Sequence, residues 1–305
     1  MAIQVGCTGW SYPDWYKNGF YDRKEEVRLK QGSELNYHLW KYSKFFSCTE
    51  INSFNYMVSK IDEQELQRLN VGPKAIWWYK KELEKRELKE KYSMFESLPF
   101  ITKNWDQSTP EDFIFSAKVP GMITHAKCLR DCAVETTLFL KGIHGVSKMK
   151  YLLYEFPSYF TKKEFFDDFL DYFSRINEDY HYVVEFRSAD WQEEEVFDFI
   201  RKKQIILALS EVNDKGVRTI KENIGTEFYV RIIGEHGIIQ SFGAANIYEE
   251  KRKVLNTWAK NVSGGDAFVF INNNFAGNAP ETANYFKKLV GEKPKEWKMD
   301  LRRFG

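Results

Sequence analysis

Eight short apolar runs divide the chain, and most of them end in polar or charged residues. Helix-length amphipathic stretches lie between several of the runs, at 39–46, 161–176, 193–203, 246–262 and 279–291. Strands that alternate with helices along a chain are typical of parallel β–α–β units. The expected strands are residues 3–10, 48–53, 113–120, 150–157, 182–187, 205–211, 227–234 and 267–274.

Eight such units favour a closed parallel α/β barrel of the TIM-like (β/α)8 type, with an open doubly wound sheet as the alternative. The chain has 305 residues, which suits a single barrel domain over residues 1–305. Residues 60–110 break the rhythm. Within them, residues 74–95 are rich in charge and space their apolar residues at close to 3.6, which predicts a helix. We therefore expect a helical insertion between strands two and three, beside or over the barrel mouth.

Overall charge and cysteine content limit the classes of partner. The chain carries 45 basic and 44 acidic residues, a net charge of +1, which argues against a general nucleic-acid binder.

Cys7, Cys48, Cys128 and Cys132 form no paired zinc motif, so buried reduced thiols are expected. We find neither a signal-peptide pattern nor an apolar run long enough to span a bilayer, and expect a cytoplasmic protein without a membrane partner. The sequence identifies no cofactor, no metal site and no oligomeric state.

The polar residues at the predicted strand ends form the candidate site, because barrel sites lie at the carboxyl ends of the strands. In VVEFRSADW, residues 183–191, side chains alternate, so Glu185 and Arg187 share one face. The candidate catalytic residues are the carboxylates of Glu50, Glu155 and Glu185, any of which could act as acid or base if crowding raised its pKa toward neutrality. The candidate binding residues are Trp10, Tyr12, Asn52, Lys118, His125, Arg187, Arg231, Asn272 and Asn273.

Each of these charges also has a structural interpretation. Glu185 and Arg187 can form a salt bridge that holds a strand end, and Lys118 can pair with Glu50 or Glu155. A single loop histidine such as His125 is more often a surface or capping residue than a catalyst. An asparagine run is a turn signal as well as a possible pocket wall.

The chemistry that best fits this set is acid–base catalysis on a small anionic or polyhydroxylated substrate. Lys118, Arg187 and Arg231 suit a carboxylate or phosphate, while Trp10 and Tyr12 suit stacking on a sugar or a base. A phosphodiester-processing enzyme and a metabolite-binding protein without turnover are the alternatives. The sequence has five histidines and no HExxH, GxSxG or P-loop motif, so it predicts no established catalytic signature.

Six stretches, taken together and in order, resemble one protein family. They are GCTGWSYPDWYKNGFY (6–21), CTEINSFNY (48–56), FIFSAKVPGMITH (113–125), VVEFRSADW (183–191), YVRIIG (229–234) and INNNFAGNAPETA (271–283). The family is the YecE-like domain of unknown function number 72. The resemblance implies a TIM-like barrel and no established activity. The chain departs from the family pattern at Glu155, where a glutamine is usual, and lacks a histidine before Gly234.

Overall fold

The protein is described by a computed structural model over residues 2–56, 63–87, 98–176, 179–210, 227–234, 237, 239, 245 and 247–297. Eight parallel strands follow one another around a closed barrel, which β1 completes by pairing with β8. This arrangement confirms the predicted TIM-like α/β barrel over the open sheet. The strands are β1 (Ile3–Thr8), β2 (Cys48–Ile51), β3 (Ile114–Lys118), β4 (Met149–Phe156), β5 (His181–Phe186), β6 (Ile206–Ser210), β7 (Glu227–Ile232) and β8 (Asp266–Ile271).

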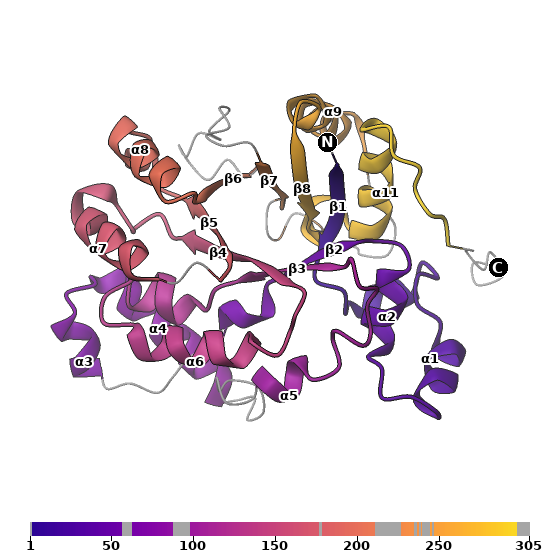
Figure 1. Ribbon diagram of the computed structural model, residues 1–305, viewed down its shortest axis with the longest axis horizontal. Helices are drawn as coiled ribbons and strands as arrows, with labels where there is room; N and C mark the ends of the chain where they lie inside the picture. The colour runs from indigo at the N-terminus through magenta and orange to yellow at the C-terminus, as the bar shows by residue number, and fades with distance from the viewer. Residues whose placement is uncertain are drawn as a thin grey trace.

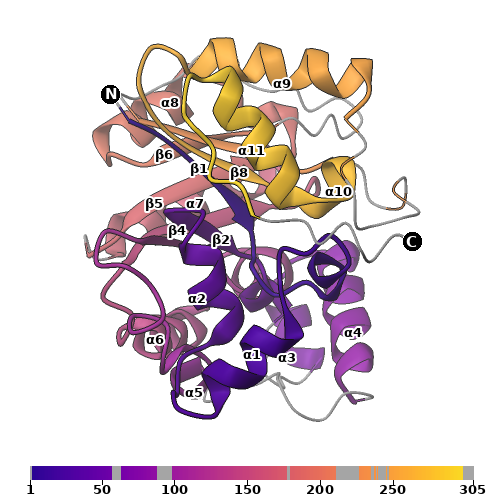
Figure 2. The same ribbon diagram turned by 90° about the vertical axis from the view of Figure 1, so that its right-hand side faces the viewer.

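Helices form the outer layer around the barrel. In both views α3 to α6 gather on one side of the strands, and α9 and α11 lie on the opposite side (Figures 1 and 2). No described helix has the length and apolar character needed to cross a membrane. The helices are α1 (Arg23–Lys30), α2 (Tyr37–Ser43), α3 (Glu63–Arg68), α4 (Pro73–Glu87), α5 (Leu98–Thr102), α6 (Ala133–Ile143), α7 (Lys162–Arg175), α8 (Glu194–Lys202), α9 (Glu249–Val262), α10 (Asn273–Ala276) and α11 (Ala279–Leu289).

Most of the observed strands end before the predicted ones do. At the end of β1, Gly9 has a φ of 77° and leaves the strand direction. At the end of β8, the side chain of Asn272 accepts a hydrogen bond from the Asn274 amide at 2.9 Å and begins α10. The predicted strand over 267–274 therefore ends at Ile271, because its asparagines form a helix cap. Residues 88–95, Glu211 and Asn246, which the sequence analysis assigned to helices or strands, lie outside the described residues.

Side-chain alternation along the strands divides the barrel interior into layers. The lower layer is an apolar plug of Cys48, Tyr151, Leu153, Val183, Ala208, Tyr229, Phe268 and Phe270. Two residues further along four of these strands come Glu50, Glu155, Glu185 and Arg231. Because side chains alternate with a period of two, these four charged residues point inward above the plug. Val184, Val230 and Ile232, each next to a charged residue in sequence, belong to the apolar cluster between strands and helices.

The insertion between β2 and β3 packs beside the loop that follows β3. The Trp78 ring of α4 lies 5.1 Å from the His125 ring, centroid to centroid. Trp78 also lies against Gly121, where an added Cβ would come within 2.4 Å of the indole. Such a close approach requires glycine. The insertion is therefore part of the wall around the barrel mouth.

The four cysteines are buried and free of disulfides. Burial raises the pKa of the Cys48 and Cys132 thiols to about 12, and those of Cys7 and Cys128 rise as well. Since the thiolate is the reactive form, we expect none of the four to react with Ellman's reagent in the folded protein. All four should react after unfolding in guanidinium. A thiol that reacts rapidly before unfolding would contradict this expectation.

Candidate functional site

A cavity of about 1270 Å³ opens at the carboxyl ends of the strands. It is bounded by the loops after β1, β2, β3, β4, β5, β7 and β8 and by part of the insertion. Of the twelve residues proposed from the sequence, ten line it: Trp10, Tyr12, Asn52, Lys118, His125, Glu155, Arg187, Arg231, Asn272 and Asn273. Glu50 and Glu185 are buried beside Arg231 and do not line the cavity, so they support the site from below.

The floor of the cavity is a network of charged residues, and Arg231 lies at its centre. Its other members are Glu50, Lys118, Glu155, Glu185 and Arg187. The Nε and Nη2 of Arg231 donate to the two oxygens of Glu50 at 2.9 and 3.0 Å. Its Nη1 donates to Glu155 at 2.6 Å and also to Glu185. A single planar guanidinium, 1% exposed, therefore joins carboxylates from β2, β4 and β5. This geometry uses the fixed fork of donors that distinguishes arginine from lysine.

Two further cations complete the charge balance. The Lys118 ammonium lies 2.9 Å from Glu155, and Arg187 lies 2.8 Å from Glu185 and 3.4 Å from Glu155. Three cations thus face three carboxylates, so the formal charges cancel. Lys118 and Arg187 retain 10% and 13% side-chain exposure, whereas Arg231, which also lines the cavity, retains 2%. The floor is paired and neutral, and it offers no excess positive charge to an incoming anion.

Protonation states follow from burial and pairing. Burial would raise the pKa of Glu155, but the charges of Lys118, Arg187 and Arg231 outweigh burial and hold the pKa well below its usual value. Burial lowers the pKa of Lys118, and the attraction of Glu155 only partly opposes that effect. Glu155 is therefore a carboxylate, and Lys118 gives up its proton more readily than an exposed lysine does.

His125 lies in a distorted segment after β3. A π-helical turn, Met122–Ala126, holds it, and the next residues include Cys128, Leu129 and Asp131 with positive φ. The Nδ1 atom of the His125 ring forms a hydrogen bond with the Thr124 hydroxyl at 2.8 Å. The backbone carbonyl of His125 accepts a hydrogen bond from the Tyr159 hydroxyl at 2.9 Å. π-helical turns and strained backbone are concentrated at functional sites. Burial, aided by the charge of Lys118, lowers the pKa of His125 to about 3, so the ring is neutral near pH 7.

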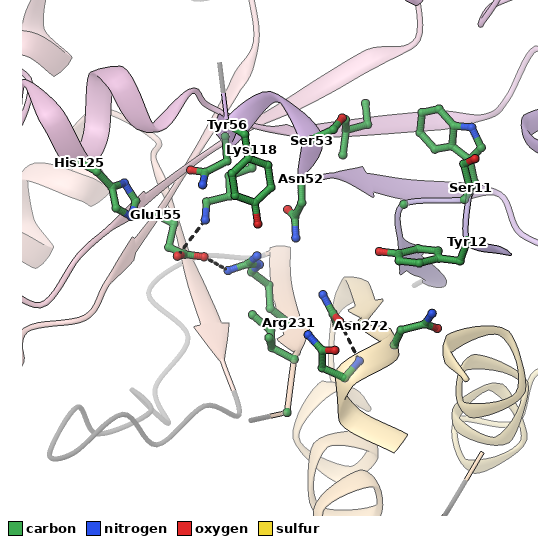
Figure 3. Close-up of a pocket in the computed structure, with 18 of the residues that line it drawn as sticks. Ser11, Tyr12, Asn52, Ser53, Tyr56, Lys118, His125, Glu155, Arg231 and Asn272 are labelled. Carbon is green, nitrogen blue, oxygen red and sulfur yellow. Dashed lines mark hydrogen bonds and ion pairs between the residues drawn. The ribbon is translucent and has the colours of Figure 1, made fainter. Parts of the chain in front are cut away.

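Aromatic rings and amides line the remaining walls. Trp10 meets Trp105 edge to face with centroids 4.9 Å apart, and the Tyr12 hydroxyl donates to the Thr8 carbonyl at 2.7 Å. Figure 3 shows Tyr12 and Ser11 at one end of the cavity, with Lys118, Glu155 and His125 grouped at the other. Asn52 lies between these two ends (Figure 3). The ion pair of Lys118 and Glu155 therefore lies at one end of the cavity, with Tyr56 beside it, and Tyr12 lies at the other end (Figure 3).

A family model described as a protein of unknown function, DUF72, matches residues 98–303, well over half of the chain. The chain belongs to the DUF72 family. Two solved DUF72 structures share its fold. The protein from Thermotoga maritima MSB8 is 21% identical, with a TM-score of 0.62, and the match covers 96% of this chain and 100% of that one. The protein from Enterococcus faecalis V583 is 16% identical, with a TM-score of 0.57 and coverage of 97% and 100%. The curated proteins compared with the chain gave no match.

The DUF72 barrel also places residues at the cavity that the sequence analysis did not select. Ser53, Asn55 and Tyr56 come from a 3-10 turn directly after β2, and Trp105 comes from the insertion. The SFNY stretch at the end of a predicted strand indicates the turn. Trp105 has no such signal, because its position depends on how the insertion packs.

Two amides at the cavity have unused hydrogen-bonding capacity. The side-chain oxygens of Asn52 and Asn55 are buried and have no hydrogen-bond partner within the part of the chain that the structure describes. Buried polar atoms are usually paired, so each of these is a candidate contact for a ligand. An amide can present either an acceptor or two donors, which matches a hydroxyl group.

Asn273 has a different role from Asn52. Its side-chain oxygen accepts from the Trp15 indole at 3.0 Å and from the Ala279 amide at 2.8 Å. Those bonds tie α10 and the start of α11 to the loop after β1. Asn273 therefore shapes the cavity wall, and its side-chain oxygen already accepts two hydrogen bonds from the protein.

The described residues contain no group of three His, Cys, Asp or Glu side chains arranged to hold a metal ion. The three carboxylates of the floor are instead bound by Arg231, Arg187 and Lys118.

Proposed function

We propose that this DUF72 protein is an enzyme that performs acid–base chemistry on a small polyhydroxylated substrate. The observation that carries the proposal is the ion pair of Glu155 and Lys118, which opens into a cavity whose other walls include amides, hydroxyl groups and aromatic rings. Within the pair, Glu155 is held ionised and Lys118 has a lowered pKa. Both pKa values are lowered, so an ionised carboxylate stands beside an ammonium that gives up its proton more readily than usual, and perturbed groups of this kind recur where protons are transferred.

The walls favour hydroxyl groups over a free anion. The floor is neutral because its three cations are paired, so an anion would have to displace a carboxylate from Lys118 or Arg187. Hydroxyl groups can instead bond to the amides of Asn52 and Asn55, while Trp10 and Tyr12 cover the apolar face of a sugar-like ligand. The polyhydroxylated substrate is thus the better supported of the two substrate classes predicted from the sequence.

Binding of sorbitol, ribitol and inorganic phosphate, followed by saturation-transfer NMR, tests the substrate class. We expect the two polyols to bind and phosphate not to compete with them. Binding of phosphate alone would favour the anionic alternative, and binding of a short oligonucleotide would favour the phosphodiester alternative. Incubation with a panel of aldoses and ketoses, followed by NMR for products, separates an enzyme from a protein that only binds.

Asn52→Ala should weaken polyol binding about tenfold, which corresponds to about 1.4 kcal/mol and is within the range for a hydrogen bond left unmade. Titration by calorimetry or NMR measures the change. Asn256→Ala is the matched control, because Asn256 is exposed on α9 and lies outside the cavity. Equal affinities for Asn52→Ala, Asn256→Ala and the unmodified protein would contradict the assigned role of Asn52.

A further inference from the structure

Lys118 is the lysine that lines the cavity within the described residues. It is the last residue of β3, so the barrel frame fixes its backbone, and its ammonium is held 2.9 Å from Glu155. Figure 3 shows its amine beside Glu155, with the His125 ring nearby. A second buried lysine, Lys127, pairs with Glu135 at 3.0 Å and does not line the cavity.

We propose that the Lys118 amine is a nucleophile that forms an imine with the substrate, and hence that the substrate is a polyhydroxylated aldehyde or ketone. The proposal rests on the proposed function, whose polyhydroxylated substrate it narrows to carbonyl compounds. The geometry supports it through a single amine that opens into the cavity from a fixed strand end. Burial and the neighbouring Arg231 charge both favour the neutral amine, which is how enzymes activate lysine nucleophiles.

The reaction balances without any further reactant. The ammonium releases one proton to solvent, and the nitrogen lone pair forms a bond to the carbonyl carbon as the carbon–oxygen π bond breaks. The two hydrogens of the amine then leave with the carbonyl oxygen as one molecule of water. The product is a carbon–nitrogen double bond between Lys118 and the substrate. Its nitrogen takes one proton back from solvent to become the iminium, and no group is oxidised or reduced.

The charge balance of the floor favours the protonated imine. An iminium carries the same single positive charge as the ammonium that it replaces, at the same nitrogen. Its charge would lie beside Glu155, so the three cations would still match the three carboxylates. Burial penalises an unpaired charge, and imine formation at this position creates none.

Trapping of the imine on the unmodified protein tests the proposal. The protein is incubated with dihydroxyacetone or glycolaldehyde and sodium cyanoborohydride, which reduces an imine to a stable amine, and its peptides are mapped by mass spectrometry. We expect at least about tenfold more adduct on Lys118 than on any exposed lysine at pH 7, because its lowered pKa raises the fraction of neutral amine and the cavity holds the carbonyl compound beside it. Excess sorbitol should protect Lys118 and leave the exposed lysines unaffected.

Variants define the site of reaction. Lys118→Arg should abolish the dominant adduct, while Lys260→Arg, a change on the exposed face of α9, should leave it intact. A thermal melt checks that Lys118→Arg is folded; if it is not, the peptide map and sorbitol protection of the unmodified protein decide the question.

Labelling of Lys118 no faster than that of the exposed lysines would overturn the imine proposal. If sorbitol still binds and Asn52→Ala weakens its binding, the proposed function survives that result and only the carbonyl substrate class fails. If sorbitol and ribitol do not bind either, the proposed function fails with it.

Discussion

Replacing Arg231 with methionine is expected to lower the free energy of unfolding by about 3–5 kcal/mol, the usual loss when one partner of a buried ion pair is removed. Arg231 is 1% exposed and is bonded to Glu50, Glu155 and Glu185. Its loss leaves Glu50 with a buried negative charge, and the remaining side-chain hydrogen bond to that carboxylate from the described residues is donated by the Tyr229 hydroxyl of the plug, at 2.8 Å. Denaturant unfolding monitored by circular dichroism measures the change.

Arg201→Met is the matched control. Arg201 also pairs with two carboxylates, Glu194 and Asp198, but it lies on the outer face of α8 with 44% side-chain exposure. Exposed ion pairs contribute little because water and salt screen them, so this variant should unfold close to the unmodified protein. Equal losses for Arg231→Met and Arg201→Met would show that the floor is not a buried network.

A second substitution tests whether charge is the cause of the loss. In the Arg231→Met background, Glu50→Gln removes the carboxylate that Arg231 had held through two bonds. The double variant should therefore be more stable than Arg231→Met alone, whereas Glu50→Gln in the unmodified protein should be destabilising. Effects that simply add would indicate that the two residues do not interact.

Side-chain alternation explains why so much of the candidate site could be predicted. The period of two places Glu50, Glu155, Glu185 and Arg231 on the inner face of their strands, and the barrel brings those faces together. The depth of each residue could not be predicted, because it depends on the side chains packed over it and not on its strand position alone. Glu155 and Glu185 are paired in register on β4 and β5, yet only Glu155 lines the cavity.

Pairing among the charges also required the structure. The sequence placed Lys118, Arg187 and Arg231 near one mouth but could not show that three carboxylates already compensate them. The salt bridge proposed for Glu185 and Arg187 in VVEFRSADW is present, and their functional interpretation stays a prediction. Glu185 belongs to a buried network beneath the cavity, and Arg187, two residues later, belongs both to that network and to the cavity wall.

The insertion shows a different limit. The predicted helix within it corresponds to α4, since local periodicity is sufficient to identify a helix. The contacts of Trp78 with His125 and of Trp105 with Trp10 join residues about 50 and 95 positions apart in sequence. Such contacts arise from tertiary packing, and no pattern within either segment encodes them.

Stability should fall as the pH decreases from about 6.5, and His125 should account for a large part of the loss. The pKa of His125 is about 3 in the folded protein against 6.5 for an unburied histidine, mainly because of burial and the charge of Lys118. Between pH 3 and pH 6.5, His125 binds a proton in the unfolded chain but not in the folded protein. The contribution of His125 to the free energy of unfolding therefore decreases with falling pH, by about 1 kcal/mol per pH unit between pH 6 and 5.

Urea unfolding of the unmodified protein and of His125→Gln between pH 7 and 5 measures that slope. The variant should show a smaller slope, although not a zero one, because burial also lowers the pKa of His38. Glu155 acts in the same direction, but only below about pH 4.5, where its carboxyl begins to take up protons in the unfolded chain. His144→Gln, which removes an exposed ring at the end of α6, serves as the control. If His125→Gln and His144→Gln leave the slope equally unchanged, the folded protein takes up a proton at His125 over the same pH range as the unfolded chain, and burial does not lower its pKa.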